Sequence, residues 1–193
     1  WFAEFLRWMR ESEHGKDEAA AKNNHGTYYD VQVVSFAMFL GQWEFATNVL
    51  SAARTKRIAV QIEPDGRQPL ELARTKAWSY STGNLSGLMS LARLGENVSV
   101  DLWNYETADG RGIRKAFDFL TPFALREKKW SYQQLGGWSP DGFAPLARQA
   151  GLKFKQPGYV SVALKMAKPA VSARVNLLAP PLPLSERDSS STR

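Results

Sequence analysis

The chain lacks cysteine altogether, and this absence excludes disulfide frameworks, zinc-thiolate sites, iron-sulfur clusters and cysteine nucleophiles. Only two histidines are present, so no set of metal ligands remains, and we expect neither a metal nor a cofactor. No apolar run approaches the ~20 residues of a membrane-spanning helix, so we expect no membrane insertion. No glycine-rich phosphate loop precedes a helix, and no stretch of useful length alternates as a strand does.

The residues that are present have the composition of a globular chain. With 193 residues, of which 44% are hydrophobic and 23% charged, the chain has the size of one ordinary domain. Its net charge of +6 suggests an anionic partner such as nucleic acid, a membrane surface or an acidic polysaccharide. Most of this charge is C-terminal, since residues 151–193 hold 7 Lys and Arg against 2 Asp and Glu. These cations are too few and too scattered for nucleic-acid binding, which we do not expect.

Helical periodicity dominates the sequence and predicts an all-α fold. Gly41 and the Pro64-Asp65-Gly66 turn separate helical stretches, and residues 130–143 are loop-like. The predicted helices cover residues 1–9, 17–22, 28–40, 43–57 with a possible extension to 62, 70–94, 112–125 and 144–150. After Met166, several prolines and a serine-rich end predict a disordered tail over residues 167–193.

The chain opens within an amphipathic pattern. Apolar residues recur with helical spacing from Trp1 to Met9, without an initiator methionine or the basic and apolar regions of a signal peptide. We therefore expect that an N-terminal portion precedes this sequence in the natural protein.

Chemistry-bearing residues concentrate in two segments. The first, Lys22 to Tyr29, places two amides, an imidazole and two phenols at the entrance to an apolar helix, where backbone N–H groups favour an anion. The second, Gln61 to Tyr80, passes through a turn into a helix that carries two cations and a tyrosine.

These two segments resemble the alginate lyase family of polysaccharide lyases. The resemblance rests on Asn23-Asn24-His25 before an apolar helix and, later, on the Pro-Asp-Gly turn, Glu71-Leu72-Ala73-Arg74 and Ser79-Tyr80. It covers roughly residues 1–150 and identifies the chain as a divergent member. The resemblance implies an incomplete α/α toroid over residues 1–166, no cofactor, a periplasmic or secreted location, and an anionic polysaccharide as substrate. Alginate is one such substrate, and another polyuronate such as glucuronan is an alternative. The sequence leaves the oligomeric state open.

The activity that this resemblance implies is β-elimination, which removes the C5 proton of a uronate and expels the 4-O-linked sugar. Because the adjacent carboxylate opposes proton loss, donors must neutralise it, and Asn24, His25 and Arg74 are suitable residue types. Tyr80 is the predicted acid, and also the base when the proton and leaving group lie on one side of the ring. A phenol acting as base near neutrality needs positive charge nearby, which Arg74 or Lys76 can supply. His25 is the alternative base for the opposite C5 epimer.

Helix geometry refines these roles. Lys76 and Tyr80 share a face of a continuous helix, whereas Arg74 does not, so Arg74 fits best at or before the helix start. Further residues are predicted to bind the substrate. They are Lys22, Asn23, Tyr28, Arg67, Lys76 and Trp138, the last because it lies in a glycine-rich loop. The other tryptophans considered, Trp78, Trp103 and Trp130, are more typical of core positions.

Each of these residues also has a purely structural interpretation. Asn24 and His25 could form a helix N-cap, and Tyr80 could be a half-buried tyrosine with a bonded hydroxyl. Arg74 could pair with Glu71 or another exposed carboxylate, and His14 is expected to be a solvated helix-end residue. As a whole, the chain could be a non-catalytic carbohydrate-binding domain or an inactive fragment of a lyase.

Overall fold

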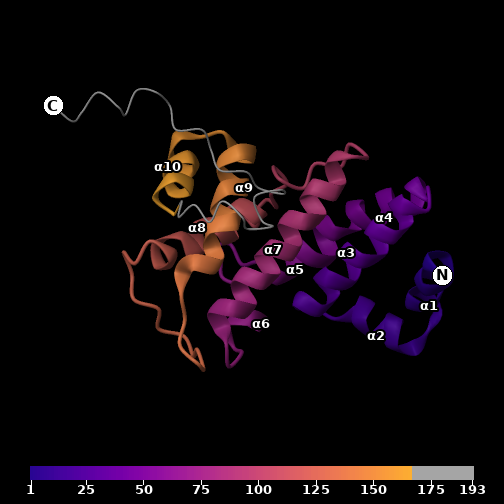
Figure 1. The fold of residues 1–193 in the computed structure, drawn as a ribbon, viewed down its shortest axis with the longest axis horizontal. Helices are drawn as coiled ribbons and strands as arrows, with labels where there is room; N and C mark the ends of the chain where they lie inside the picture. The colour runs from indigo at the N-terminus through magenta and orange to yellow at the C-terminus, as the bar shows by residue number, and fades with distance from the viewer. Residues whose placement is uncertain (167–193) are drawn as a thin grey trace. The chain divides into compact units, whose positions relative to one another are not determined.

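The computed structural model describes residues 1–166, which form helices and connecting loops with a single isolated β-bridge and no strand (Figure 1). The all-α prediction is therefore confirmed for this part of the chain. The chain divides into two compact units, Trp1–Ser139 and Pro140–Arg193. The predicted tail, residues 167–193, lies outside the described residues.

The first unit holds eight of the α-helices in the described part of the chain, with a π-helical turn, Arg54–Ile58, between the fourth and the fifth. These helices are α1 (Phe2–Glu11), α2 (Glu13–Ala20), α3 (Asn24–Phe39), α4 (Trp43–Ala53), α5 (Ala59–Gln61), α6 (Pro69–Leu72), α7 (Ala77–Glu96) and α8 (Ile113–Ala124). The second unit contains a 3-10 turn, Pro140–Phe143, followed by α9 (Ala144–Phe154) and α10 (Pro157–Lys165).

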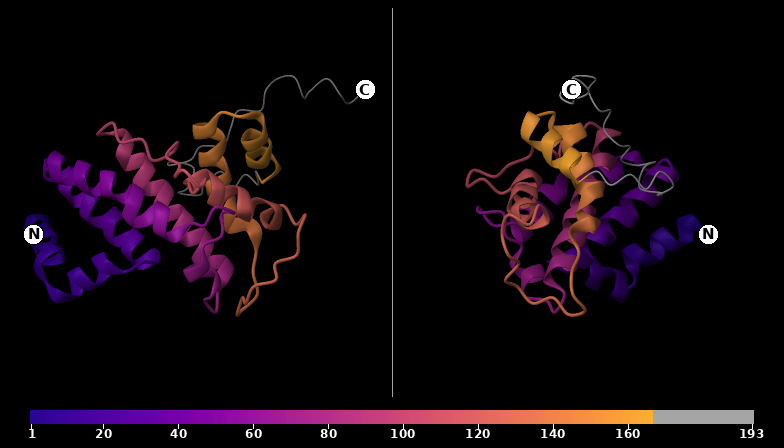
Figure 2. Two further views of the ribbon diagram at one scale, coloured as in Figure 1. Left: turned by 180° about the vertical axis from the view of Figure 1, so that it is seen from behind. Right: turned by 60° about the vertical axis from the view of Figure 1, so that its left-hand side comes forward.

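Helix α3 is the centre of the first unit, because it packs against α1, α2, α4 and α7 (Figures 1 and 2). Its apolar side chains Val33, Val34 and Ala37 are fully buried. A glycine allows α7 to approach closely, since a Cβ on Gly87 would lie 2.8 Å from Thr27 Cγ2. This close packing brings the first half of α3 alongside α7.

A sharp corner joins α1 to α2. Ser12 caps α2, with its Oγ accepting a hydrogen bond of 3.1 Å from the Gly15 backbone N–H. A Cβ at Gly15 would clash with the Met9 backbone, so this corner requires glycine. Helix α2 therefore begins before the predicted residue 17.

The predicted continuous helix over residues 70–94 is wrong, because it is two helices with a break at Ala73–Lys76. The break is held by a distant loop: Ala77 N–H donates to the Gln133 carbonyl at 3.0 Å, and Leu135 N–H donates to the Thr75 carbonyl at 2.9 Å. Long-range backbone pairing has thus overridden a locally helical sequence.

Other helix boundaries also differ from the prediction. Helix α3 begins at Asn24 rather than residue 28, and α9 continues past Gly151 to Phe154. Helix α10, which begins with Pro157 in its first turn, was not predicted at all.

Candidate active site

The site begins at the first turn of α3. Asn23 is the N-cap, and its Oδ1 accepts a 3.1 Å hydrogen bond from the His25 backbone N–H. Capping therefore uses Asn23, while Asn24 and His25 are the first two residues of the helix. The side chain of His25 is 50% exposed, and its Nδ1 lies 3.1 Å from both carboxylate oxygens of Glu18. Since a carboxylate only accepts, Nδ1 carries the proton in this arrangement, which leaves Nε2 facing away from Glu18.

Glu71 lies at the centre of the predicted residues. The residue is only 1% exposed, and its Oε1 accepts a 2.6 Å hydrogen bond from the Asn24 backbone N–H. Burial raises the pKa of Glu71, and the Asn24 N–H, Arg74 and His25 each act to lower it. The interpretation of Glu71 as an exposed partner for Arg74 is therefore wrong, because this carboxyl group is buried behind the start of α3.

Two polar atoms beside this hydrogen bond have no partner within residues 1–166. They are Glu71 Oε2 and Asn24 Oδ1, both buried. A buried acceptor without a hydrogen bond costs free energy, so a ligand group that donates a hydrogen bond to these oxygens would bind favourably.

Arg74 and Tyr80 lie against each other. Arg74 occupies the break before α7, as helix geometry predicted, and its guanidinium carbon is 3.9 Å from the centroid of the Tyr80 ring. Such a cation-π contact fixes the guanidinium and places positive charge beside the phenol. Neither the Arg74 guanidinium nor Tyr80 Oη has a hydrogen-bond partner in the described part of the chain.

A hydrogen bond between α3 and α7 orients this region. The Tyr28 hydroxyl donates to the Gly83 carbonyl at 3.0 Å. Because Gly83 follows Tyr80 by three residues on α7, the two positions share a helix face. Tyr80 therefore lies on the side of α7 that meets the start of α3.

A buried polar network supports the cap. Thr27 Oγ1 donates to Gln61 Oε1 at 2.9 Å, and Asn84 Nδ2 donates to Gln61 Oε1 and Gln68 Oε1, both at 2.8 Å. Gln61 Nε2 in turn donates to the Asn23 carbonyl at 3.2 Å. The N-cap of α3 is thus connected to α7 through side chains that water does not reach.

An ion pair fixes α2 against α3. Arg57, only 3% exposed, donates to Asp30 Oδ2 at 2.7 Å and Oδ1 at 3.0 Å. It also donates to the carbonyls of Ala21 at 2.7 Å and Ala19 at 2.9 Å, at the C-terminus of α2. The π-helical turn places Arg57 so that it holds the segment immediately before Asn23.

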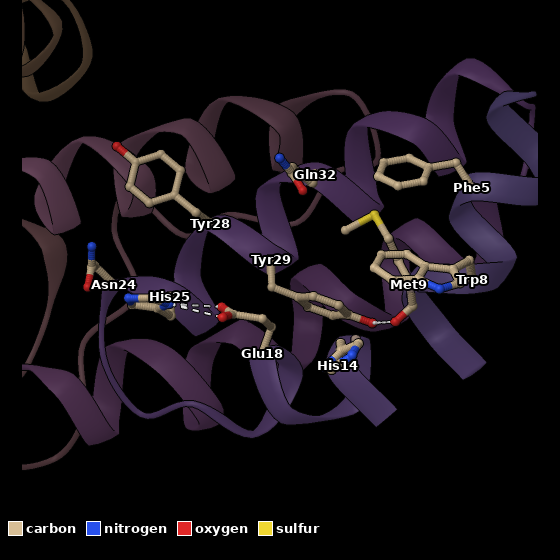
Figure 3. A pocket seen from close by; sticks show the side chains of 11 residues that line it. Phe5, Trp8, Met9, His14, Glu18, Asn24, His25, Tyr28, Tyr29 and Gln32 are labelled. Atoms are coloured by element: carbon tan, nitrogen blue, oxygen red, sulfur yellow. Dashed lines mark hydrogen bonds and ion pairs between the residues drawn. The ribbon is translucent and has the colours of Figure 1, made fainter. Parts of the chain in front are cut away.

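The polar start of α3 opens into a pocket of about 400 Å³ (Figure 3). Three helices, α1, α2 and α3, supply its walls. The lining residues are Phe5, Trp8, Met9, His14, Gly15, Glu18, Asn24, His25, Tyr28, Tyr29 and Gln32. Asn24, His25 and Tyr28 are thus predicted site residues that share this pocket, while Arg74 and Tyr80 do not line it.

The remaining predicted substrate-binding residues lie elsewhere. Lys22 is exposed between α2 and α3, and Lys76 is exposed at the N-cap position of α7. Arg67 is paired with Asp65 at 2.6 Å and Glu63 at 3.3 Å.

The last of the predicted residues, Trp138, belongs to an aromatic cluster. It packs against Trp78, with ring centroids 4.8 Å apart, and lies near Trp130. Trp78, Trp103 and Trp130 are all buried, as expected of core tryptophans.

Sequence reasoning missed several residues of this region. Glu71 lies within the Glu-Leu-Ala-Arg motif, but its burial has no local signal. Glu18 and Trp8 have no signal either, because nothing in the sequence links their helices to the site. His14 is exposed as expected, yet it also lines the pocket, since it precedes Glu18 by one helical turn.

Neither a metal site nor a membrane span emerges from residues 1–166. No group of three or more acidic, histidine or cysteine side chains in this part could hold a metal ion. No helix in the same range is both long and apolar enough to cross a bilayer.

Comparison with known proteins places these features in one family. The sequence pattern that describes the family "Alginate lyase" matches residues 1–130. The crystal structure of an alginate lyase from Bacteroides ovatus superposes with a TM-score of 0.88 and 33% identity, over 93% of this chain and 48% of that one. The chain thus spans about half the length of that relative, whereas no curated protein sequence matches it. The α/α toroid is the fold of this family, as the resemblance implied. The chain belongs to the alginate lyase family.

Proposed function

We propose that this chain binds an anionic polyuronate, alginate or a related polymer such as glucuronan, and cleaves it by β-elimination. One observation carries the proposal. The guanidinium of Arg74 has no hydrogen-bond partner in residues 1–166 and lies 3.9 Å from the ring centroid of Tyr80, whose hydroxyl is equally unpartnered. The planar guanidinium presents paired N–H donors that match a carboxylate, so a ligand carboxylate suits this side chain.

Neutralising the substrate carboxylate is the first task. Arg74 supplies a fixed cation with parallel N–H donors, while Asn24 and His25 contribute an amide and an imidazole from the start of α3. Burial raises the pKa of Glu71, and the Asn24 backbone N–H, Arg74 and His25 act in the opposite direction. Such donors act mainly on the charge that develops as C5 loses its proton, and losing one costs about 10²- to 10³-fold in kcat.

Proton transfer is the second task. A base removes the C5 proton, a double bond forms between C4 and C5, and the C4–O4 bond breaks as the leaving oxygen takes a proton. Tyr80 serves as the acid, and as the base too when the proton and leaving group share one side of the ring. For the opposite C5 epimer His25 is the base, through the Nε2 that its contact with Glu18 leaves available.

Lyase activity can be tested with purified chain and poly-uronates of defined composition. The unsaturated product absorbs in the ultraviolet, and we expect this absorbance to rise with alginate or glucuronan. Tyr80→Phe should abolish turnover while binding persists. Tyr105→Phe, which also removes one hydroxyl, is the matched control because the Tyr105 ring lies near Arg54 and not beside Arg74. A folded chain that binds polyuronates without cleaving them would support the carbohydrate-binding alternative.

We further propose a periplasmic or secreted location. The proposal rests on the family, whose polymeric substrates do not diffuse through membranes. Fractionation of cells that produce the natural protein, followed by immunodetection, tests it, and finding the protein only in the cytoplasm would overturn it.

A further inference from the structure

Aromatic side chains form a row on α1 that ends in the pocket. The rings of Trp1 and Phe5 lie 5.5 Å apart with an angle of 16°, and those of Phe5 and Trp8 lie 5.7 Å apart with an angle of 8°. Three rings are therefore nearly parallel along the helix. The last of them, Trp8, is 50% exposed and lines the pocket together with Phe5.

The pocket has two chemically different ends (Figure 3). Asn24 and His25 lie at one end, Phe5 and Trp8 at the other, and Tyr29 lies between them. From Asn24 to Gln32 the α3 wall extends about 12 Å at 1.5 Å per residue, which is longer than one sugar ring. A ligand that fills the pocket must therefore contact the aromatic end as well.

Charge along the pocket limits how the aromatic end can recognise a sugar. No Lys or Arg lines the pocket, and its only carboxylate is Glu18. Glu18 lies against His25, so the aromatic end has neither a cation to pair with a uronate carboxylate nor a carboxylate of its own. The aromatic end can instead bury the apolar C–H face of a pyranose against an indole, and the exposed amide of Gln32 can bond its hydroxyls.

We propose that Trp8, backed by Phe5, is a stacking platform for the sugar next to the one held by Asn24 and His25. The platform rests on the proposed function, because its ligand is the same oligosaccharide. It recognises the C–H face of the ring and not its carboxylate. A neutral pyranose is therefore accepted there as well as a uronate.

Trp8→Ala and Trp8→Phe test this, with Trp43→Ala as the matched control. Trp43 is 53% exposed, close to the 50% of Trp8, but lies on α4 and does not line the pocket. Dissociation constants for uronate di- and tetrasaccharides are measured by calorimetry on the 193-residue chain carrying Tyr80→Phe, which prevents cleavage, and KM is measured without that change. We expect Trp8→Ala to weaken tetrasaccharide binding about tenfold, or about 1.4 kcal/mol, and disaccharide binding less than about twofold. Trp8→Phe should retain most of the affinity, and Trp43→Ala all of it.

A second measurement needs no folded Ala variant. The indole N–H resonance of Trp8, assigned from its absence in Trp8→Phe, should shift when tetrasaccharide is added, while that of Trp43 stays in place. Equal losses for both ligand lengths, or an unshifted Trp8 resonance, would overturn the platform. If the unmodified chain cleaves polyuronates but Trp8→Ala leaves the length dependence unchanged, only the platform fails. If the chain neither binds nor cleaves them, the proposed function fails with it.

Discussion

Replacing Asp30 by Asn removes one charge from the buried pair that holds α2 against α3. Arg57 then keeps its two bonds to the carbonyls of Ala19 and Ala21, but its charge loses the carboxylate that received two hydrogen bonds of 2.7 and 3.0 Å. Removing one partner of a buried ion pair costs about 3 to 5 kcal/mol. Because two carbonyl contacts remain, we expect the lower end, about 3 kcal/mol.

Thermal and urea unfolding measure this loss. For a chain of this size, each kcal/mol shifts Tm by about 2 to 4 °C, so Asp30→Asn should lower Tm by about 6 to 12 °C. Glu63→Gln, which breaks the exposed contact with Arg67 at 3.3 Å, is the control and should leave Tm nearly unchanged. The double replacement Asp30→Leu with Arg57→Met should recover much of the loss, since no buried charge remains.

Two results would refute this reasoning. A Tm for Asp30→Asn as high as that of Glu63→Gln would mean that Arg57 is satisfied by the α2 carbonyls alone. A double variant less stable than Asp30→Asn would mean that the pair itself, and not the unpaired charge, supplies the stability.

Three further predictions concern the site directly. Gly26→Ala should destabilise the chain by more than about 1 kcal/mol in urea unfolding, because a Cβ there clashes with the guanidinium of Arg57; an unchanged midpoint would contradict this packing. Burial holds the pKa of Glu71 above its ordinary value of 4.5, so the folded state binds this proton more readily than the unfolded chain. We therefore compare the free energies of unfolding of the unmodified chain and of Glu71→Gln as a function of pH. The difference should favour the unmodified chain most below about pH 4.5 and should shrink as the pH rises through the folded-state pKa of Glu71. Urea titrations with the opposite slope would exclude a raised pKa for Glu71. Arg74→Lys should lower kcat by about 10²-fold with little change in Tm, since lysine keeps the charge but not the paired donors over Tyr80, and unaltered initial rates would remove Arg74 from the mechanism.

Local patterns were enough to predict much of this protein. The spacing of apolar residues predicted most helices of the first unit, and the Asn-Asn-His and Arg-to-Tyr segments indicated the family. The position of Arg74 before the start of α7 followed from its separation from Tyr80 alone. These features succeeded because they depend on residues a few positions apart, whose geometry a helix determines.

Only the tertiary structure decided how distant residues combine. The break after α6 depends on backbone bonds to Gln133 and Leu135, and the burial of Glu71 depends on the start of α3, 47 residues earlier in the chain. Likewise, the pocket joins Trp8 and His25 only because two tight corners fold α1 and α2 back along α3. Such contacts have no periodic signature in the sequence, because they are selected by packing between helices and by the need to pair buried polar groups.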